Sequence, residues 1–176
     1  SVTTAWDLGI GDSTAIWFCQ RVGKEWHLID YLEHAGVGLD WYAKEIDRRP
    51  YKYGAHILPH DAEARELGTG KTRVETLASL GIHHVTVLLI QRIEDGINAA
   101  RLMLSQAWID GEKCKRGIDA LRNYRRDWDD RRKVFSDHPL HDWSSHAADA
   151  LRYLALGAQA SDGGWGKAIK YPKRTG

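Results

Sequence analysis

Residues 4–18 read Thr4-Ala5-Trp6-Asp7-Leu8-Gly9-Ile10-Gly11-Asp12-Ser13-Thr14-Ala15-Ile16-Trp17-Phe18. Apolar and β-branched residues flank a Gly-Asp turn signal, so the stretch predicts two strands joined at residues 11–12. Asp7 stands inside the first strand, on the face that it shares with Ala5 and Gly9. Strand interiors disfavour aspartate, and burying an unpaired carboxylate is costly. Asp7 is therefore either a solvent-facing residue of an edge strand or a metal ligand on a central strand.

Length and composition indicate the class of protein. The chain has 176 residues, enough for one domain with a sizeable core, and a formal net charge of +1, so any nucleic-acid surface must be local. Its two cysteines, Cys19 and Cys114, lie far apart, which indicates a reduced intracellular protein. The sequence shows neither an apolar run of about 18 residues nor a signal peptide. The first strand begins almost at residue 1, as expected of a domain cut from a longer protein.

The order of the expected elements predicts a mixed α/β sheet. A third strand continues the antiparallel pair, and two further strands follow, each preceded by a helix. Helix-joined strands should be parallel, so we expect a five-stranded sheet flanked by helices, with three antiparallel strands and then two parallel ones. The fifth strand is nearly all apolar and should be buried on both faces. The later strands span residues 24–31, 54–59 and 84–89, and the main helices span 40–49, 72–81, 93–108 and 144–157.

Two further carboxylates stand where a ligand would bind. Asp61 follows the fourth strand, and ligands of open α/β sheets bind outside the carboxyl ends of strands. Asp149 lies near the start of the last helix, on a largely buried side, where the helix dipole favours negative charge. Arg152 and Gln159 form the sector of this helix that should face water. The alternatives are a turn aspartate for Asp61 and a buried Asp–Arg or Asp–His pair for Asp149.

Three carboxylates on separate elements suit one chemistry. Two ions of Mg²⁺ or Mn²⁺, about 3.5–4 Å apart, promote phosphodiester hydrolysis, and such ions accept both carboxylate and phosphate oxygens. Asp7, Asp61 and Asp149 should then converge on one site. Without metal the three charges would repel one another, so bound metal should also stabilise the fold.

The loop before residue 72 is a candidate DNA contact. The run Leu67-Gly68-Thr69-Gly70-Lys71-Thr72 is not a P-loop, because Arg65 stands where that motif needs glycine. Residues 72–75 match a capping box, so a helix starts here. Lys71 and Arg73 flank this start and could hold a DNA phosphate, with a merely solvated side chain as the alternative.

A basic segment covers residues 112–133, which carry nine basic and five acidic side chains. Apolar residues at helical spacing indicate a helix beneath the charge. Arg125 and Arg126 are candidates for a DNA-backbone surface, and a solvated helix face is the alternative. We expect residues 1–160 to form the domain and residues 161–176, which are basic and rich in glycine, to form a flexible tail.

These residues resemble a known family. The strand order and the positions of Asp7, Asp61 and Asp149 resemble the ribonuclease H-like superfamily. Within it, the run Ser145-His146-Ala147-Ala148-Asp149-Ala150-Leu151-Arg152-Tyr153 and the opening Asp7-Leu8-Gly9-Ile10-Gly11-Asp12 resemble the C-terminal nuclease domain of tailed-phage terminase large subunits. The resemblance covers most of the chain, with the motifs in the family's order.

The resemblance implies a metal-dependent, largely sequence-nonspecific endonuclease that cuts concatemeric double-stranded viral DNA during genome packaging in the host cytoplasm. Asp7, Asp61 and Asp149 would be its catalytic residues and metal ligands. Asp12 would be an auxiliary carboxylate or simply a turn residue, and His146 would orient a ligand or water. The implied partners are double-stranded DNA, the terminase ATPase domain, whose Walker motifs are missing here, the portal and the small terminase subunit, with no membrane.

Three alternatives remain open at this point. His138, His141 and His146 with Asp142 could form a zinc site, although their spacing matches no standard zinc pattern. The chain could be another ribonuclease H-like nuclease, such as a junction resolvase or an RNA–DNA hybrid nuclease. It could also be a non-catalytic module that docks DNA or the portal.

Overall fold

β1 (Val2–Asp7) and β2 (Ser13–Val22) form the antiparallel pair that the opening stretch predicts. β3 (Glu25–Ala35) continues this meander by pairing with β2. On the other side of β1, β4 (Tyr53–Leu58) lies parallel to β1, and β5 (Val85–Val87) lies parallel to β4. The computed structural model describes residues 1–9 and 12–161, so the expected tail lies outside the described residues apart from residue 161.

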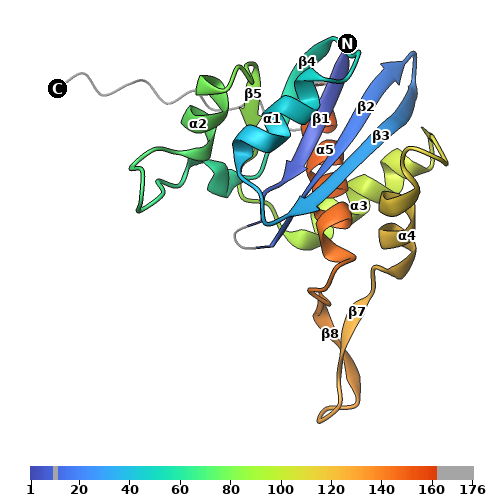
Figure 1. Ribbon diagram of the computed structural model, residues 1–176. Helices are drawn as coiled ribbons and strands as arrows, with labels where there is room; N and C mark the ends of the chain where they lie inside the picture. The colour runs from blue at the N-terminus through green and yellow to red at the C-terminus, as the bar shows by residue number, and fades with distance from the viewer. Residues whose placement is uncertain (10–11, 162–176) are drawn as a thin grey trace.

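The sheet contains a strand that the sequence pattern concealed. Over the described residues it has six strands rather than five, in the order β5-β4-β1-β2-β3-β6 (Figure 1). The helix expected over 93–108 ends early, and β6 (Ala107–Ile109) pairs in parallel with β3. The apolar spacing of residues 107 and 108 suited a helix. Their backbone instead supplies partners for the N–H and C=O groups at the free edge of β3. The mixed α/β class is confirmed, whereas the strand count is corrected.

β5 differs from expectation in its burial. Val85 and Val87 are half-buried and Thr86 is exposed, so the prediction that this strand is buried on both faces is wrong. The reason is its place in the sheet, because β5 stands at the edge and pairs with β4 alone. The apolar composition of this segment therefore did not indicate a central strand of the sheet.

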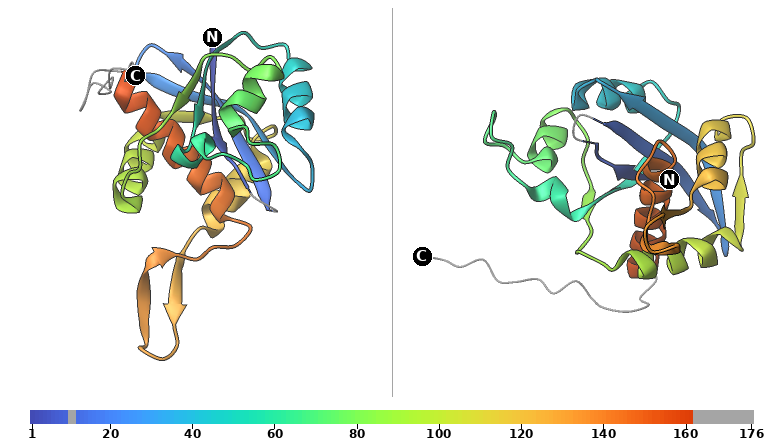
Figure 2. Two further views of the ribbon diagram at one scale, coloured as in Figure 1. Left: turned by 90° about the vertical axis from the view of Figure 1, so that its left-hand side faces the viewer. Right: turned by 90° about the horizontal axis from the view of Figure 1, so that it is seen from below.

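Helices cover both faces of the sheet (Figure 2). The helices are α1 (Leu39–Asp47), α2 (Arg73–Ser79), α3 (Ile93–Leu104), α4 (Lys115–Asn123) and α5 (Ser145–Ser161). α1 and α2 pack on one face around Trp6 and Phe18, and α3, α4 and α5 pack on the other around Ala5 and Trp17. Consecutive residues of a strand point to opposite faces, so β1 contributes to both cores.

α2 and α5 show how local signals set the helix ends. α2 begins at the predicted capping box, in which Thr72 Oγ1 accepts from the Glu75 amide and the Glu75 carboxylate accepts from the Thr72 amide. α5 continues past Gly157, where the sequence suggested an end. A Cβ at position 157 would lie 2.5 Å from Ile57 Cδ1, so this glycine lets the helix approach the sheet rather than terminating it.

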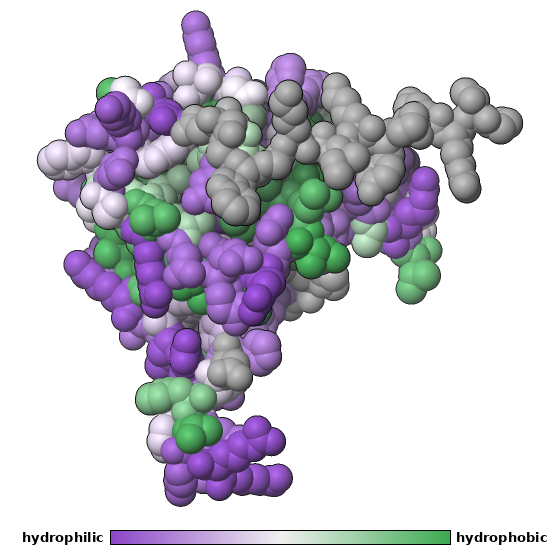
Figure 3. Space-filling model, turned by 180° about the vertical axis from the view of Figure 1, so that it is seen from behind, coloured by the Kyte–Doolittle hydropathy of each residue, from purple (hydrophilic) through white to green (hydrophobic). Residues whose placement is uncertain are grey.

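A β-hairpin projects from the body of the domain (Figures 1 and 2). It consists of β7 (Arg126–Asp129) and β8 (Val134–Pro139), with Trp128 opposite Phe135. Part of the basic segment, which the sequence suggested lies over one helix, thus forms this hairpin after α4. Hydrophobic atoms lie on the hairpin above a hydrophilic tip (Figure 3). None of the helices in the described ranges has the length and apolar character that crossing a bilayer requires.

Candidate functional site

Three acidic residues lie at one edge of the sheet. Asp7 is the last residue of β1, and Asp61 lies in η1 (His60–Glu63), the 3₁₀ turn that follows β4. β1 and β4 are parallel neighbours, so their carboxyl ends share that edge. Asp149 comes from the first half of α5, which packs against β1 (Figure 1).

The charges of these residues act on a common neighbour. Burial raises the pKa of the Tyr153 phenol in α5, and the negative charges of Asp7, Asp149 and Asp61 raise it further. Burial also raises the pKa of Asp7, against the hydrogen bond from His146, and the charge of Asp149 adds to the increase. The three carboxylates therefore share one electrostatic environment. Their joint coordination of metal stays a prediction.

Asp7 is held by His146. Its side chain is 17% exposed, and its Oδ2 lies 3.0 Å from His146 Nδ1. The hydrogen bond to Asp7 raises the pKa of His146, while burial lowers it and the charges of Asp7, Asp12 and Glu33 raise it. His146 thus contacts the candidate ligand Asp7 directly, and its role in orienting a ligand or water stays a prediction.

Asp149 is held by Arg152, one helical turn further along α5. Asp149 Oδ1 accepts hydrogen bonds from Arg152 Nε at 3.2 Å and from Nη2. Arg152 is 9% exposed, so the expectation that it faces water is wrong. Its aliphatic stem packs against Gly96 of α3, where an added Cβ would lie 3.2 Å from the Arg152 Cβ. The absence of a side chain on α3 at that point makes room for the buried ion pair.

Asp61 is held by Arg73, the first residue of α2. Arg73 Nη1 lies 3.8 Å from Asp61 Oδ2 and donates to the Leu8 carbonyl at 3.3 Å, while Nε lies 3.6 Å from Glu66. The Arg73 side chain is 10% exposed. Arg73 therefore ties α2 to the end of β1 and to Asp61, and this burial revises the expectation that it contacts DNA.

Each of the three carboxylates keeps one oxygen without a protein partner. Within residues 1–9 and 12–161, Asp7 Oδ1 and Asp149 Oδ2 accept no hydrogen bond. In the same part of the chain, Asp61 Oδ1 is buried and has no hydrogen-bond partner. A buried, unpaired carboxylate oxygen is costly unless a ligand engages it, so this donor set fits a hard divalent cation.

The metal site is not preassembled. Across the described residues, no group of three or more His, Cys, Asp or Glu side chains is arranged to hold a metal ion. Each carboxylate instead faces a cationic or histidine side chain. Mg²⁺ needs few protein ligands and retains several waters, so a tight three-residue cage is not a requirement for it.

Asp12 and the histidines lie beside this site. Asp12 Oδ1 is 3.6 Å from His146 Nε2, and Asp12 Oδ2 is 3.4 Å from His141 Nε2. His146 thus bridges Asp7 and the half-exposed Asp12, which supports an auxiliary role for Asp12. His138 lies in β8 of the hairpin. The described residues contain no arrangement of these side chains that suits zinc.

Glu33 is a site neighbour that the sequence did not single out. Asp7 pairs with Ala15, and Ala15 pairs with Glu33, so Asp7 and Glu33 occupy one row on one face of the sheet. The Glu33 side chain is 7% exposed and is held by Arg116 at 3.3 Å. Its signal in the sequence is weak, because only the pairing register of three strands aligns it with Asp7.

The candidate DNA contacts differ in exposure. Lys71 is exposed in the loop before α2, and Arg126 is exposed at the start of β7. Arg125 is also exposed, and its Nη2 lies 3.4 Å from Asp142 Oδ2. These three remain available to a nucleic acid, whereas Arg73 is buried as described above.

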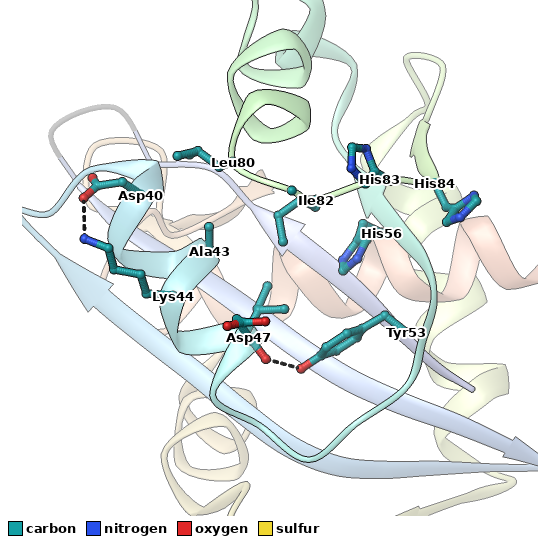
Figure 4. A pocket seen from close by; sticks show the side chains of 12 residues that line it. Asp40, Ala43, Lys44, Asp47, Tyr53, His56, Leu80, Ile82, His83 and His84 are labelled. Atoms are coloured by element: carbon teal, nitrogen blue, oxygen red, sulfur yellow. Dashed lines mark hydrogen bonds and ion pairs between the residues drawn. The ribbon is translucent and has the colours of Figure 1, made fainter.

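A pocket of about 470 Å³ lies on the opposite face of the sheet, between α1, β4 and the link from α2 to β5 (Figure 4). His56, His83 and His84 stand on one side, and the ion pair of Asp40 with Lys44 stands on the other (Figure 4). This pocket contains none of the three carboxylates of the site. It lies on the face of the sheet where the polar side chains of β1 are the uncharged Thr4 and Trp6.

Comparison with solved structures shows which fold this is. The large terminase nuclease domain of bacteriophage SPP1, solved with bound Mn, matches with a TM-score of 0.68 and 18% identity over 90% of this chain and 86% of that one. The P22 large terminase nuclease domain matches with a TM-score of 0.66 and 19% identity over 90% and 81%. For the large terminase of a thermophilic bacteriophage the values are 0.64 and 17%, over 89% and 39%. This chain thus spans about two fifths of that thermophilic phage protein.

No protein-family model and no curated protein sequence matches the chain. At these identities the structural matches establish the fold. The described chain has the ribonuclease H-like fold of large-terminase nuclease domains, and the fold expected from the sequence is confirmed.

Proposed function

We propose that this chain is the nuclease domain of a tailed-phage large terminase, a Mg²⁺- or Mn²⁺-dependent endonuclease that cuts concatemeric double-stranded DNA during genome packaging in the host cytoplasm. The observation that carries the proposal is the set of three carboxylates, Asp7, Asp61 and Asp149, at one edge of this fold. Each keeps an oxygen that has no partner in the described chain. The bound Mn of the SPP1 domain supports divalent-metal chemistry on this fold.

The residues around the carboxylates prepare the site for metal. Two divalent cations bound by Asp7, Asp61 and Asp149 would provide a Lewis acid for the scissile phosphate and lower the pKa of the attacking water. His146, Arg73 and Arg152 each fix one carboxylate through one side. This fixation reduces the mutual repulsion of the three charges and leaves the other oxygen of each carboxylate available.

The partners proposed for the chain follow from its share of a longer relative. Because it spans about two fifths of the large terminase of a thermophilic bacteriophage, we propose that an ATPase domain accompanies it in a full-length terminase. Double-stranded DNA would contact the exposed Lys71, Arg125 and Arg126. The portal and the small terminase subunit complete the proposed assembly.

Metal-dependent cleavage of plasmid DNA tests the function. We expect the purified chain to nick and linearise plasmid DNA in Mn²⁺ or Mg²⁺ and to be inactive in EDTA. Asp61→Asn should abolish most of this activity. Asp47→Asn is the matched control, because Asp47 is an exposed carboxylate of α1 on the other face of the sheet.

The choice of substrate separates this function from its alternatives. Preference for a four-way junction or an RNA–DNA hybrid over plain duplex would identify a different ribonuclease H-like nuclease. Absence of both cleavage and Mn²⁺ binding would indicate a docking module and contradict the proposal.

A further inference from the structure

A second pocket, of about 530 Å³, is lined by Ala148 and Arg152, the chain neighbour and the ion-pair partner of Asp149. The proposed function uses individual residues of its lining but assigns no ligand to the cavity itself. It is enclosed by α3, α5 and the base of the hairpin. Its volume lies in the range of small-molecule sites, about 300–1,000 Å³. Its charged lining consists of the side chains of Arg101, Arg125, Arg126, Arg152 and Glu94.

The lining carries an excess of positive charge that the protein does not neutralise. Arg152 is paired with Asp149, and Arg125 with Asp142. In the part of the chain that the structure describes, Arg101 and Arg126 form no ion pair. Glu94 is half-exposed and already faces Arg92 at 3.8 Å. Two guanidinium groups therefore lack an anionic partner at this pocket.

The wall of the pocket also contains a residue with a buried hydroxyl group. Tyr124 lines the pocket, and within residues 1–9 and 12–161 its Oη is buried without a hydrogen-bond partner. Buried hydroxyl groups normally have a partner, because an unsatisfied one is costly. Burial also raises the pKa of Tyr124 to about 12, so the group is a hydrogen-bond donor at neutral pH.

The rest of the lining is apolar. Ile93 and Ile97 of α3 and Pro139 of β8 lie beside the arginines. An occupant of matching chemistry has an anionic group and an apolar or aromatic body. Guanidinium groups bind phosphate through paired N–H donors, which favours phosphate over a simple carboxylate among anions.

We propose that this pocket binds a nucleoside phosphate, with the phosphate at Arg126 and Arg101, a hydrogen bond from Tyr124, and the nucleoside against the apolar wall. The ligand is either a free nucleotide or the phosphorylated end of a DNA strand. The second source rests on the proposed nuclease function, whereas the pocket itself does not. Arg152 borders both the pocket and Asp149, so an occupant would lie directly behind the catalytic site.

Calorimetry in EDTA with deoxyadenosine monophosphate as the probe tests the proposal without involving cleavage. We expect saturable binding of the nucleotide, at least about tenfold weaker binding of deoxyadenosine, and about tenfold weaker nucleotide binding by Arg126→Gln, the factor expected from one charge-assisted hydrogen bond. Arg131→Gln is the matched control, because this exposed arginine lies in the turn of the hairpin, outside the pocket. Its affinity should not change.

Tyr124→Phe keeps the ring and removes the hydroxyl group. It should weaken nucleotide binding several-fold while leaving the melting temperature of the free protein unchanged or raised, since an unsatisfied group is lost. A 5′-phosphorylated oligonucleotide compared with its unphosphorylated form distinguishes a DNA end from a free nucleotide as the ligand. Equal affinity of all variants, or equal binding of nucleotide and nucleoside, would overturn the proposal. DNA cleavage without nucleotide binding would overturn the pocket alone, and binding without cleavage would overturn the nuclease function alone.

Discussion

β1 carries polar side chains on both faces, and the two faces treat them in opposite ways. Toward α1 and α2, the Thr4 hydroxyl accepts a hydrogen bond from Trp6 Nε1 at 2.8 Å and lies 2.7 Å from His56 Nδ1. Because the hydroxyl already accepts from Trp6, its own proton can be donated to His56, which is neutral. The other face and the adjoining end of β1 hold the carboxyl groups of Asp7, Asp61 and Asp149, and a protein side chain contacts one oxygen of each.

The two faces differ in how far protein groups satisfy the polar side chains. The three side chains of Trp6, Thr4 and His56 are buried and joined by two hydrogen bonds within the protein, which stabilise the sheet. At the edge of the sheet that holds Asp7, Asp61 and Asp149, here called the acidic edge, protein side chains contact only one oxygen of each carboxylate. Within the described residues, Asp61 Oδ1 is buried and has no hydrogen-bond partner. Incomplete polar networks persist in folded proteins mainly where function requires them. Five experiments test this contrast.

The largest effect is expected for the acidic edge. Asp7→Asn and Asp149→Asn should each lower Mn²⁺-dependent plasmid cleavage by more than about a hundredfold, the upper limit for losing an outer-shell partner. The double variant should lose little more, because ligands of one site act as a unit. Cleavage rates per folded molecule check this. Retention of most activity by either single variant would remove that residue from the site.

The metal-free stability of these variants also tests the structure. Repulsion alone predicts that each Asp→Asn change stabilises the apo protein. The buried pair of Asp149 with Arg152 predicts the opposite for Asp149→Asn, because an arginine that is 9% exposed loses its counter-charge. Thermal melting in EDTA decides between the two effects.

On the face of β1 that α1 and α2 cover, Thr4→Val should affect stability rather than catalysis. The change leaves Trp6 Nε1 and His56 Nδ1 without their partner, at about 1–3 kcal/mol for each unsatisfied buried group, so we expect a loss of about 2–6 kcal/mol. Chemical denaturation measures it. Thr86→Val is the control, because Thr86 is exposed on an edge strand. Equal stability of the two variants would show that the hydrogen-bond chain contributes nothing.

The pH dependence of stability tests the buried His56 on the face of the sheet that α1 and α2 cover. Burial, together with the charge of His84, lowers the pKa of His56 from 6.5 to about 4. The unfolded chain therefore takes up a proton below pH 6.5 that the folded chain refuses until about pH 4. The corresponding stability is present above pH 6.5 and is lost as the pH falls toward 4, by up to about 3 kcal/mol. His56→Gln should reduce this slope, and an unchanged slope would contradict the assignment.

The smallest effect is expected at the periphery of the acidic edge. Lys71→Gln should weaken duplex binding several-fold and lower the slope of log affinity against log salt by about 1, the signature of one lost phosphate contact. The melting temperature should not change, because Lys71 is exposed. Lys24→Gln is the control, because Lys24 is exposed and lies in the β2–β3 turn, at the end of β2 away from Asp7. Binding that is flat between low and moderate salt would exclude an electrostatic grip on DNA.

Much of the fold was predictable because its signals are local. The alternation in residues 4–8 predicts a strand with Asp7 on the face of Ala5, and the capping box predicts the start of α2. The order of strands and helices predicts a mixed sheet, which places the carboxyl ends of β1 and β4 at one edge. The first two inferences depend on residues within a few positions of one another, where backbone geometry alone sets the direction of a side chain. The third depends on the order of the elements along the chain.

The tertiary structure alone decided what each acidic residue contacts. Arg73 reaches the carbonyl of Leu8 across 65 positions, and His146 reaches Asp7 across 139. The helical pattern predicted that Arg152 faces water, but α3 packs against its side chain. Residues 107–109 form β6 because they pair with the edge of β3. Local sequence determines which conformation a segment prefers and which way its side chains point. Burial and ion pairing depend on which distant segment packs there, and that is settled by the free energy of the whole fold.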